Sequence, residues 1–269
     1  MKKRLIPFLW LLLACVLCLF LDQSAFAGQA CENKPLSVDE IVKSMDLAQH
    51  SVQALDDSGA QVALIARAGQ DLSKYGLRYS HMALAWRDHP QGRWLVVHEL
   101  NECGTAQSAL FNEGMGNFFL TDLYAYEAKI VIPGAATQER LARLLASSTP
   151  RRLHESKYNM LAYAYSTHYQ NSNQWVLESY AAASAPAGQV ETRQEAQAWL
   201  KNAPFRPITV ELSAATRLGA RMFRANVAFD DHPFDRRMAG QIDTVSVDAV
   251  VRFIRQQERD AREMTVRLR

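Results

Sequence analysis

The chain lacks the charge pattern of a nucleic-acid-binding protein. Its 269 residues carry 30 Lys and Arg against 28 Asp and Glu, and no basic stripe with interleaved aromatic residues occurs. Internal repeats, low-complexity tracts and a convincing interdomain linker are also missing, so a single domain is expected. A hydrophobic content of 48% is ordinary for a globular protein and is enough for one sizeable core, or two small ones.

The first 27 residues have the features of a secretory signal peptide. Lys2, Lys3 and Arg4 precede a nearly uninterrupted apolar run, and the small-residue pattern at 25–27 predicts cleavage after Ala27. The alternative is an uncleaved membrane anchor, because the run is close to the length of a short spanning helix. Cleavage leaves a mature domain of residues 28–269 with a formal net charge of zero, in the periplasm or secreted. Contact with a membrane is then expected only through an uncleaved leader.

Cysteine is scarce in the mature chain. Two of the four cysteines fall within the leader, which leaves Cys31 and Cys103. An even pair in an exported protein predicts a disulfide, here closing a loop of about 70 residues and contributing on the order of 4 kcal/mol. The alternatives are two buried thiols, or Cys103 as a nucleophile, although no helix start follows it to lower its pKa.

The hydrophobic pattern predicts the α+β class, with a central antiparallel sheet flanked by helices. Helices are expected at residues 38–55 behind a capping box, at 137–147, at 172 onward, at 193 onward, at 213–223 and from 247. Strands are expected at residues 61–66, 77–86, 93–100, 128–132, 204–212 and 242–247. The irregular segment 101–123 predicts a packed loop with one helical turn. The mixed charges of residues 252–269 are typical of a solvated helix face.

Two stretches predict a catalytic site. Ser172 stands at the start of an apolar helix, where free N–H groups and the helix dipole favour developing negative charge. His81 is expected near the middle of an apolar strand, as the general base for a Ser172 nucleophile. His98 or Glu99 would orient His81. Only one of these two can face the site, because neighbours on a strand point to opposite faces, and His98 is preferred slightly.

Ordinary structural roles compete with this interpretation. On local sequence alone, Ser172, or Asn171 together with Gln174, is more typical of a helix N-cap or capping box than of a catalytic site. His81 could be a hydrogen-bonded core histidine, and His98 with Glu99 could be polar surface. The phenylalanines at 118 and 119 and the tyrosines of 158–169 could line an apolar groove, but core packing is the simpler interpretation.

The mature chain resembles an exported bacterial family, domain of unknown function 2145. The resemblance rests on Arg78-Tyr79-Ser80-His81, on the block at residues 165–175 and on Phe229-Asp230-Asp231-His232-Pro233. That family is similar to the circularly permuted, NlpC-type branch of the papain-like superfamily, in which the histidine strand precedes the nucleophile helix. The resemblance implies a papain-like fold and cysteine, rather than the observed serine, at position 172.

Two functions follow as alternatives. The first is a hydrolase or acyltransferase that acts on an amide or ester of cell-wall peptide or lipid. The second is an inactive periplasmic binding or structural protein on the same fold, which the serine at position 172 favours slightly; whether the chain is an enzyme stays open. Asn171, Asn173 and Gln174 are candidate oxyanion or substrate contacts. The resemblance adds Tyr79, Asp231 and His232 as candidate substrate contacts. No metal is assigned, because Asp230, Asp231 and His232 supply too few convergent ligands, and no cofactor is expected.

Overall fold

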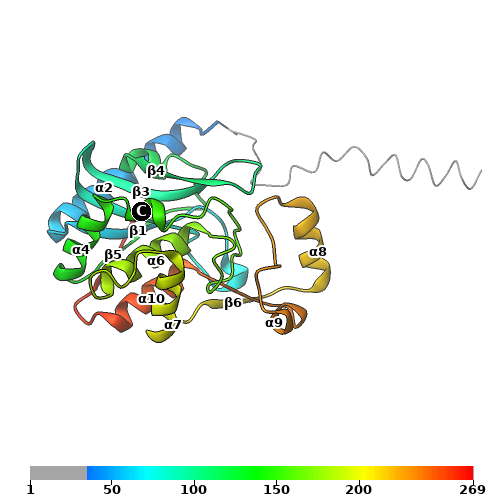
Figure 1. Ribbon diagram of the computed structural model, residues 1–269. Coiled ribbons are helices and arrows are strands. Elements are labelled where there is room, and N and C mark those ends of the chain that lie inside the picture. Colours follow the sequence, from blue (N-terminus) through cyan, green and yellow to red (C-terminus); the bar gives the residue numbers. More distant parts are fainter. Residues whose placement is uncertain (1–34, 269) are drawn as a thin grey trace, which may run out of the picture.

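A six-stranded antiparallel sheet lies at the centre of the computed structural model, which describes residues 35–268 (Figure 1). The inner strand β1 is apolar along most of its length and buried on both faces, as a strand covered by helices on both sides must be. The predicted α+β class with a central antiparallel sheet is confirmed. The strands, in the order in which they pair, are β4 (Ser108–Glu113), β3 (Gly92–Asn101), β2 (His81–His89), β1 (Val62–Ala68), β5 (Ala125–Ile132) and β8 (Arg262–Arg267).

One face of the sheet is covered by α2 (Val38–Ser58) and by the short helix α3 (Met115–Phe119). The predicted capping box is present: the Ser37 hydroxyl accepts from the backbone of Glu40, and the Glu40 carboxylate accepts from the backbone of Ser37. Gly59 ends the helix with φ of 70°, a conformation that glycine adopts without strain. The first predicted helix is therefore confirmed.

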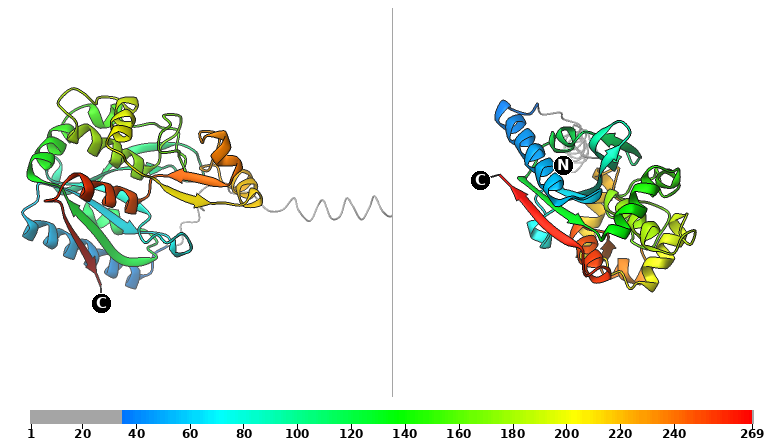
Figure 2. Two further views of the ribbon diagram at one scale, coloured as in Figure 1. Left: turned by 90° about the horizontal axis from the view of Figure 1, so that it is seen from below. Right: turned by 90° about the vertical axis from the view of Figure 1, so that its left-hand side faces the viewer.

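The opposite face packs against α6 (Ser172–Ser184). This helix is buried around its whole circumference: most of its residues from Trp175 to Ala183 are apolar, and the polar Glu178 and Ser179 between them are buried as well. Figure 2 shows α2 on one side of the sheet and α6, with the helices around it, on the other. Four further helices belong to this side: α4 (Ala135–Leu145), α5 (Thr149–Arg152), α7 (Arg193–Asn202) and α10 (Val247–Gln257).

A smaller two-stranded sheet pairs β6 (Ile208–Glu211) with β7 (Gln241–Thr244). It carries α8 (Ala214–Phe223) and α9 (Phe234–Met238), and it has a small core of its own that includes Val210, Phe229 and Ile242. Within residues 35–268, no helix is long and apolar enough to cross a membrane.

Three predictions about individual elements are wrong. Segment 101–123 contains a short helix, α3, where one helical turn is predicted, but the rest is not simply a loop, because it also contains β4. The charged C-terminal run is not one helix face: α10 ends at Gln257 and the chain returns as β8, an edge strand whose alternating polar and apolar residues pair with β5. His81 opens β2 and does not lie near its middle. The predicted leader and Cys31 lie outside the described residues, so cleavage and the disulfide stay predictions.

Candidate active site

Four side chains form a continuous hydrogen-bonded relay. The Ser172 Oγ lies 3.0 Å from His81 Nδ1, and His81 Nε2 lies 2.9 Å from His98 Nδ1. His98 Nε2 in turn lies 3.1 Å from the Glu113 Oε2. The relay therefore runs from the first turn of α6 through β2 and β3 to the last residue of β4.

The strand register explains why the last three members meet. His98 stands opposite Phe111, and Glu113 stands opposite Val96, so His98 and Glu113 are diagonal neighbours on one face of the β3–β4 pair. His81 lies on the same face of β2, because alternate residues of a strand share a face. The Phe118 ring of α3 covers both histidines, with centroid distances of 6.0 Å to His81 and 5.6 Å to His98.

One set of tautomers satisfies all three contacts. The Ser172 hydroxyl donates to His81 Nδ1, the His81 Nε2–H donates to His98 Nδ1, and the His98 Nε2–H donates to the Glu113 carboxylate. Every donor then faces an acceptor. The lone pair of His81 Nδ1 points at the serine proton, which is the orientation that a general base needs.

The surroundings keep both histidines neutral at pH 7. Burial lowers the pKa of His81 well below its ordinary range, and the nearby cations Arg67 and, when protonated, His98 lower it further. Burial also lowers the pKa of His98, although its bond to Glu113 offsets part of that effect. The same bond lowers the pKa of Glu113, so this carboxyl is ionised. The relay at neutral pH is thus a hydroxyl, two neutral imidazoles and a carboxylate.

Asn171, and not Ser172, caps helix α6. The Asn171 Oδ1 accepts from the backbone N–H of Gln174 at 2.9 Å, and its Nδ2 donates to the Thr244 Oγ1 at 3.1 Å. The cap function is therefore filled by the preceding residue, and the Ser172 hydroxyl is left to bond His81. Ser172 occupies the first helical position, where backbone N–H groups have no intrahelical acceptor and the helix dipole is positive.

Asn173 and Gln174 bond within the protein. The Asn173 Oδ1 accepts from the backbone N–H of Met82 at 2.9 Å, which joins the start of β2 to α6 and holds His81 beside Ser172. Gln174 is fully buried, and its Nε2 donates to Glu178 Oε1 at 3.2 Å. Both residues position the site from within, and neither amide is presented as an open substrate contact.

A buried ionic cluster beneath the site was not predicted from the sequence. The Glu178 carboxylate accepts from Arg193 Nε at 2.8 Å, from Gln170 Nε2 at 2.6 Å and from Gln197 Nε2 at 2.9 Å. Arg193 also donates to the backbone carbonyl of Thr167. The cluster ties the tyrosine-rich segment before α6 to α6 and α7. Its members are single polar residues in separate segments, and no local pattern joins them.

Tyr158, from that same segment, lies beside Ser172. Burial raises the pKa of the Tyr158 phenol, and the Glu99 carboxyl raises it further, while contact with the Ser172 hydroxyl partly offsets both. Its hydroxyl therefore stays protonated at neutral pH and can donate a hydrogen bond next to the serine.

The structure places His98, and not Glu99, against His81. Glu99 points to the opposite face of β3, where both carboxyl oxygens are buried without a hydrogen-bond partner among the described residues. The proposed role of Glu99 in orienting His81 is therefore wrong, because adjacent strand residues face opposite ways. Burial raises the pKa of Glu99 to about 8, with Ser108 and Arg193 offsetting part of the effect.

A family model described as "Uncharacterized protein conserved in bacteria (DUF2145)" matches residues 54–254. The chain belongs to the DUF2145 family. The matched segment includes every member of the relay, from His81 to Ser172. No curated protein and no solved structure matches the chain.

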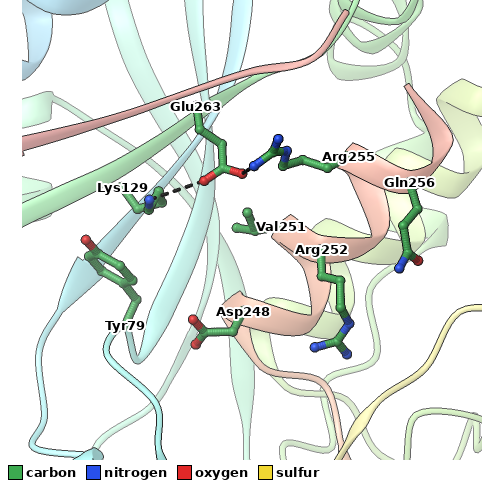
Figure 3. Close-up of a pocket in the computed structure, with 8 residues that line it drawn as sticks. All are labelled: Tyr79, Lys129, Asp248, Val251, Arg252, Arg255, Gln256 and Glu263. Atoms are coloured by element: carbon green, nitrogen blue, oxygen red, sulfur yellow. Dashed lines mark hydrogen bonds and ion pairs between the residues drawn. The ribbon is translucent and has the colours of Figure 1, made fainter. Parts of the chain in front are cut away.

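Three other predicted contacts lie apart from the relay of this DUF2145 chain. Tyr79 lines a separate cavity of about 480 Å³ with Lys129, Asp248 and Glu263, as Figure 3 shows. Asp231 accepts from the backbone N–H of Tyr163 at 2.7 Å and bonds His232 Nδ1 at 2.9 Å.

His232 Nε2 lies 3.2 Å from the backbone carbonyl of Asp243. Asp231 and His232 therefore fasten the tyrosine-rich segment to the smaller sheet, and both have their polar atoms engaged there. Among the described residues, no group of three His, Cys, Asp or Glu side chains is arranged to hold a metal ion.

Proposed function

We propose that this DUF2145 protein is an exported serine-dependent hydrolase or acyltransferase that acts on an amide or ester. The observation that carries the proposal is the Ser172–His81–His98–Glu113 relay, with the serine at a helix N-terminus and a neutral histidine beside it. Nucleophile, base and orienting groups at hydrogen-bond distance are the general signature of covalent acyl transfer.

The proposed reaction begins when the Ser172 oxygen attacks the substrate carbonyl carbon and His81 Nδ1 takes the hydroxyl proton. The imidazolium formed is stabilised through His98 by the Glu113 carboxylate. The free N–H groups of the α6 first turn and the Tyr158 hydroxyl are the candidate donors to the oxyanion. His81 then returns the proton to the departing amine or alcohol. Water, or a second acceptor, resolves the acyl-serine by the same base.

The proposed fold assignment within the α+β class is the circularly permuted papain-like fold. Support comes from the order of the chain, since the strand bearing His81 precedes the helix bearing Ser172. Serine replaces the cysteine that the resemblance implies. A neutral histidine suits serine, because a hydroxyl must lose its proton during attack and gains nothing from a preformed thiolate–imidazolium pair.

The proposed substrates are amides or esters of cell-wall peptide or lipid, met after export through the predicted leader. The test is covalent labelling of the exported, purified protein by a fluorophosphonate probe, followed by peptide mapping. Labelling at Ser172 is expected. It should be lost in Ser172→Ala and fall about 10²- to 10⁴-fold in His81→Ala.

Ser179→Ala is the matched control, because Ser179 is a buried serine on the same helix without a hydrogen-bond partner for its hydroxyl in the described chain. This variant should label like the wild type. A folded wild-type protein that no serine-directed probe modifies would overturn the proposal.

One observation favours the alternative of a binding protein with a retired nucleophile. Ser172 is only 4% exposed, so a probe must displace neighbouring side chains to reach its hydroxyl. Ser172→Cys separates the two functions. An introduced thiol that iodoacetamide alkylates in the folded protein would indicate a reachable site, whereas a thiol that stays unmodified until the protein unfolds would favour binding alone.

A further inference from the structure

Arg67 is an unassigned cation beside the relay. It stands directly opposite His81 in the β1–β2 register, so both side chains leave the same face of the sheet. Its guanidinium lies 4.8 Å from the centroid of the Phe118 ring, the ring that also covers His81 and His98. Arg67, His81 and His98 therefore surround one aromatic side chain at the edge of the site.

The charge of Arg67 is not balanced by an ion pair within residues 35–268. Its Nη1 donates to the backbone carbonyl of Phe118, and no other side-chain hydrogen bond of Arg67 occurs among the described residues. The nearby carboxylate of Glu113 bonds His98 instead. Burial lowers the pKa of Arg67 to about 10, so the side chain remains a cation at neutral pH.

Two other buried or partly buried guanidinium groups have carboxylate partners, whereas Arg140, which is also partly buried, has two acceptors, the carbonyl of Ala183 and the hydroxyl of Thr137. Arg193 pairs with Glu178 at 2.8 Å, and Arg236 pairs with Asp243 at 2.5 Å. Holding a largely buried charge without an anionic partner is costly, and a bound anion would remove part of that cost. Arg67 is only partly buried, and the N–H groups of Nε and Nη2, which form one edge of its guanidinium, have no hydrogen-bond acceptor among the described residues.

We propose that Arg67 binds a carboxylate of the substrate next to the acyl group that Ser172 attacks. The inference rests on the proposed function for the position of the acyl group, but the anion site itself depends only on Arg67. A guanidinium edge with two free N–H directions matches the two oxygens of a carboxylate. The preferred substrates are then amides or esters that carry a free carboxylate, and neutral analogues of the same length are poor substrates.

The test is a chemical-shift titration of the Ser172→Ala protein, which cannot turn over, with glutarate and with its neutral analogue glutaramide. The imidazole resonances of His81 and His98 report on binding at this place. Glutarate is expected to shift both, and glutaramide is expected to bind at least about tenfold more weakly, since a hydrogen bond to a charged group contributes that much.

Matched variants separate a binding role from a structural one. Arg67→Met, made in the same background, should weaken glutarate about 10- to 100-fold while leaving glutaramide unchanged, and Arg67→Lys should fall between. Arg78→Met is the control, because Arg78 already pairs with Glu127 at 2.5 Å. If Arg67→Met does not fold, Arg67→Lys carries the comparison.

The outcomes distinguish this inference from the proposed function. Equal binding of glutarate and glutaramide, or glutarate binding that survives in Arg67→Met, overturns the carboxylate site even if a fluorophosphonate labels Ser172. Charge-selective binding that depends on Arg67 supports the carboxylate site even if no serine-directed probe reacts. In that case only the proposed role of Ser172 as nucleophile is refuted.

Discussion

Glu99 makes a testable contribution to the pH dependence of folding. Its carboxyl is fully buried on the face of β3 away from His81, and both oxygens lack a hydrogen-bond partner among the described residues. The nearby Ser108 hydroxyl lies 3.0 Å from His154 Nε2 and is engaged there. Burial raises the pKa of Glu99 from its ordinary 4.5 to about 8. In the folded protein at pH 7 this residue is therefore mostly a neutral acid.

The sign of the effect follows from the raised pKa. Below about pH 4.5 the carboxyl is protonated in both states, and folding is unaffected by it. Between pH 4.5 and 8 the unfolded chain ionises Glu99 while the folded chain does not, so stability falls as the pH rises. The loss reaches an upper limit of about 5 kcal/mol above pH 8.

Glu99→Gln removes the ionisation and nearly preserves the shape of the side chain. The variant is expected to gain stability over the wild type as the pH rises through this window and to match it near pH 4.5. Urea unfolding followed by tryptophan fluorescence at several pH values measures the difference.

Glu127→Gln is the control of opposite sign. Burial raises the pKa of Glu127, but its bonds to Arg78 and Arg267 outweigh burial and leave the pKa lowered. Removing this carboxylate should therefore destabilise the protein most at neutral pH and least in acid. A stability difference between Glu99→Gln and the wild type that does not change with pH would refute the assignment of a neutral buried Glu99.

Three further predictions concern the relay and the exported state. Glu113→Ala should slow labelling of Ser172 about ten- to a hundredfold, because His98 loses the acceptor that fixes its tautomer, and an unchanged labelling rate would remove Glu113 from the relay. Labelling of the wild type should lose its rate only well below pH 6.5, where the lowered pKa of His81 allows protonation; an acid limb at or above pH 6.5 would contradict a neutral base. Cys31 and Cys103 of the exported protein should be alkylated under denaturing conditions only after reduction, as mass spectrometry would show, and ready alkylation without reductant would mean free thiols.

The elements that sequence reasoning placed correctly are those with local signals. The N-caps Ser37 and Thr192 each meet a glutamate three residues later, and both capping boxes are present. Asn171 and Ser213 likewise stand where α6 and α8 begin. A cap depends on four neighbouring residues only, so its energetics can be read without knowledge of the rest of the chain.

The elements that were missed depend on partners distant in sequence. The strand β4 is half exposed and carries Asn112 and Glu113 at its end, so its composition resembles that of a loop. It is a strand because it pairs with β3. The same holds for β8, whose arginines and glutamate lie on an exposed edge beside β5. Glu113 was missed as a candidate for this reason: without β4, no argument brings it to His98.

The sequence left His98 and Glu99 as alternatives for the residue that orients His81, and in the structure the two side chains lie in different environments. His98 faces Phe118, His81 and Glu113, whereas Glu99 is buried on the other face of β3, near Ser108. The period of two established that only one could meet His81. Choosing between them required knowing which face of β3 continues the face of β2 that carries His81, and that is a property of the sheet register.

The charges around position 172 suit a serine nucleophile better than a cysteine. A cysteine nucleophile paired with histidine works as a thiolate beside an imidazolium, and that pair needs a histidine of raised pKa. Here burial and the cation of Arg67 lower the pKa of His81. The ionised Glu113 bonds His98 and does not contact His81 directly. An imidazole held neutral is a poor partner for a thiolate but a competent acceptor for a hydroxyl proton. The serine and the lowered pKa of His81 thus agree with one another, and changing Ser172 to cysteine without changing Arg67 is expected to yield a slower nucleophile than a thiolate–imidazolium pair.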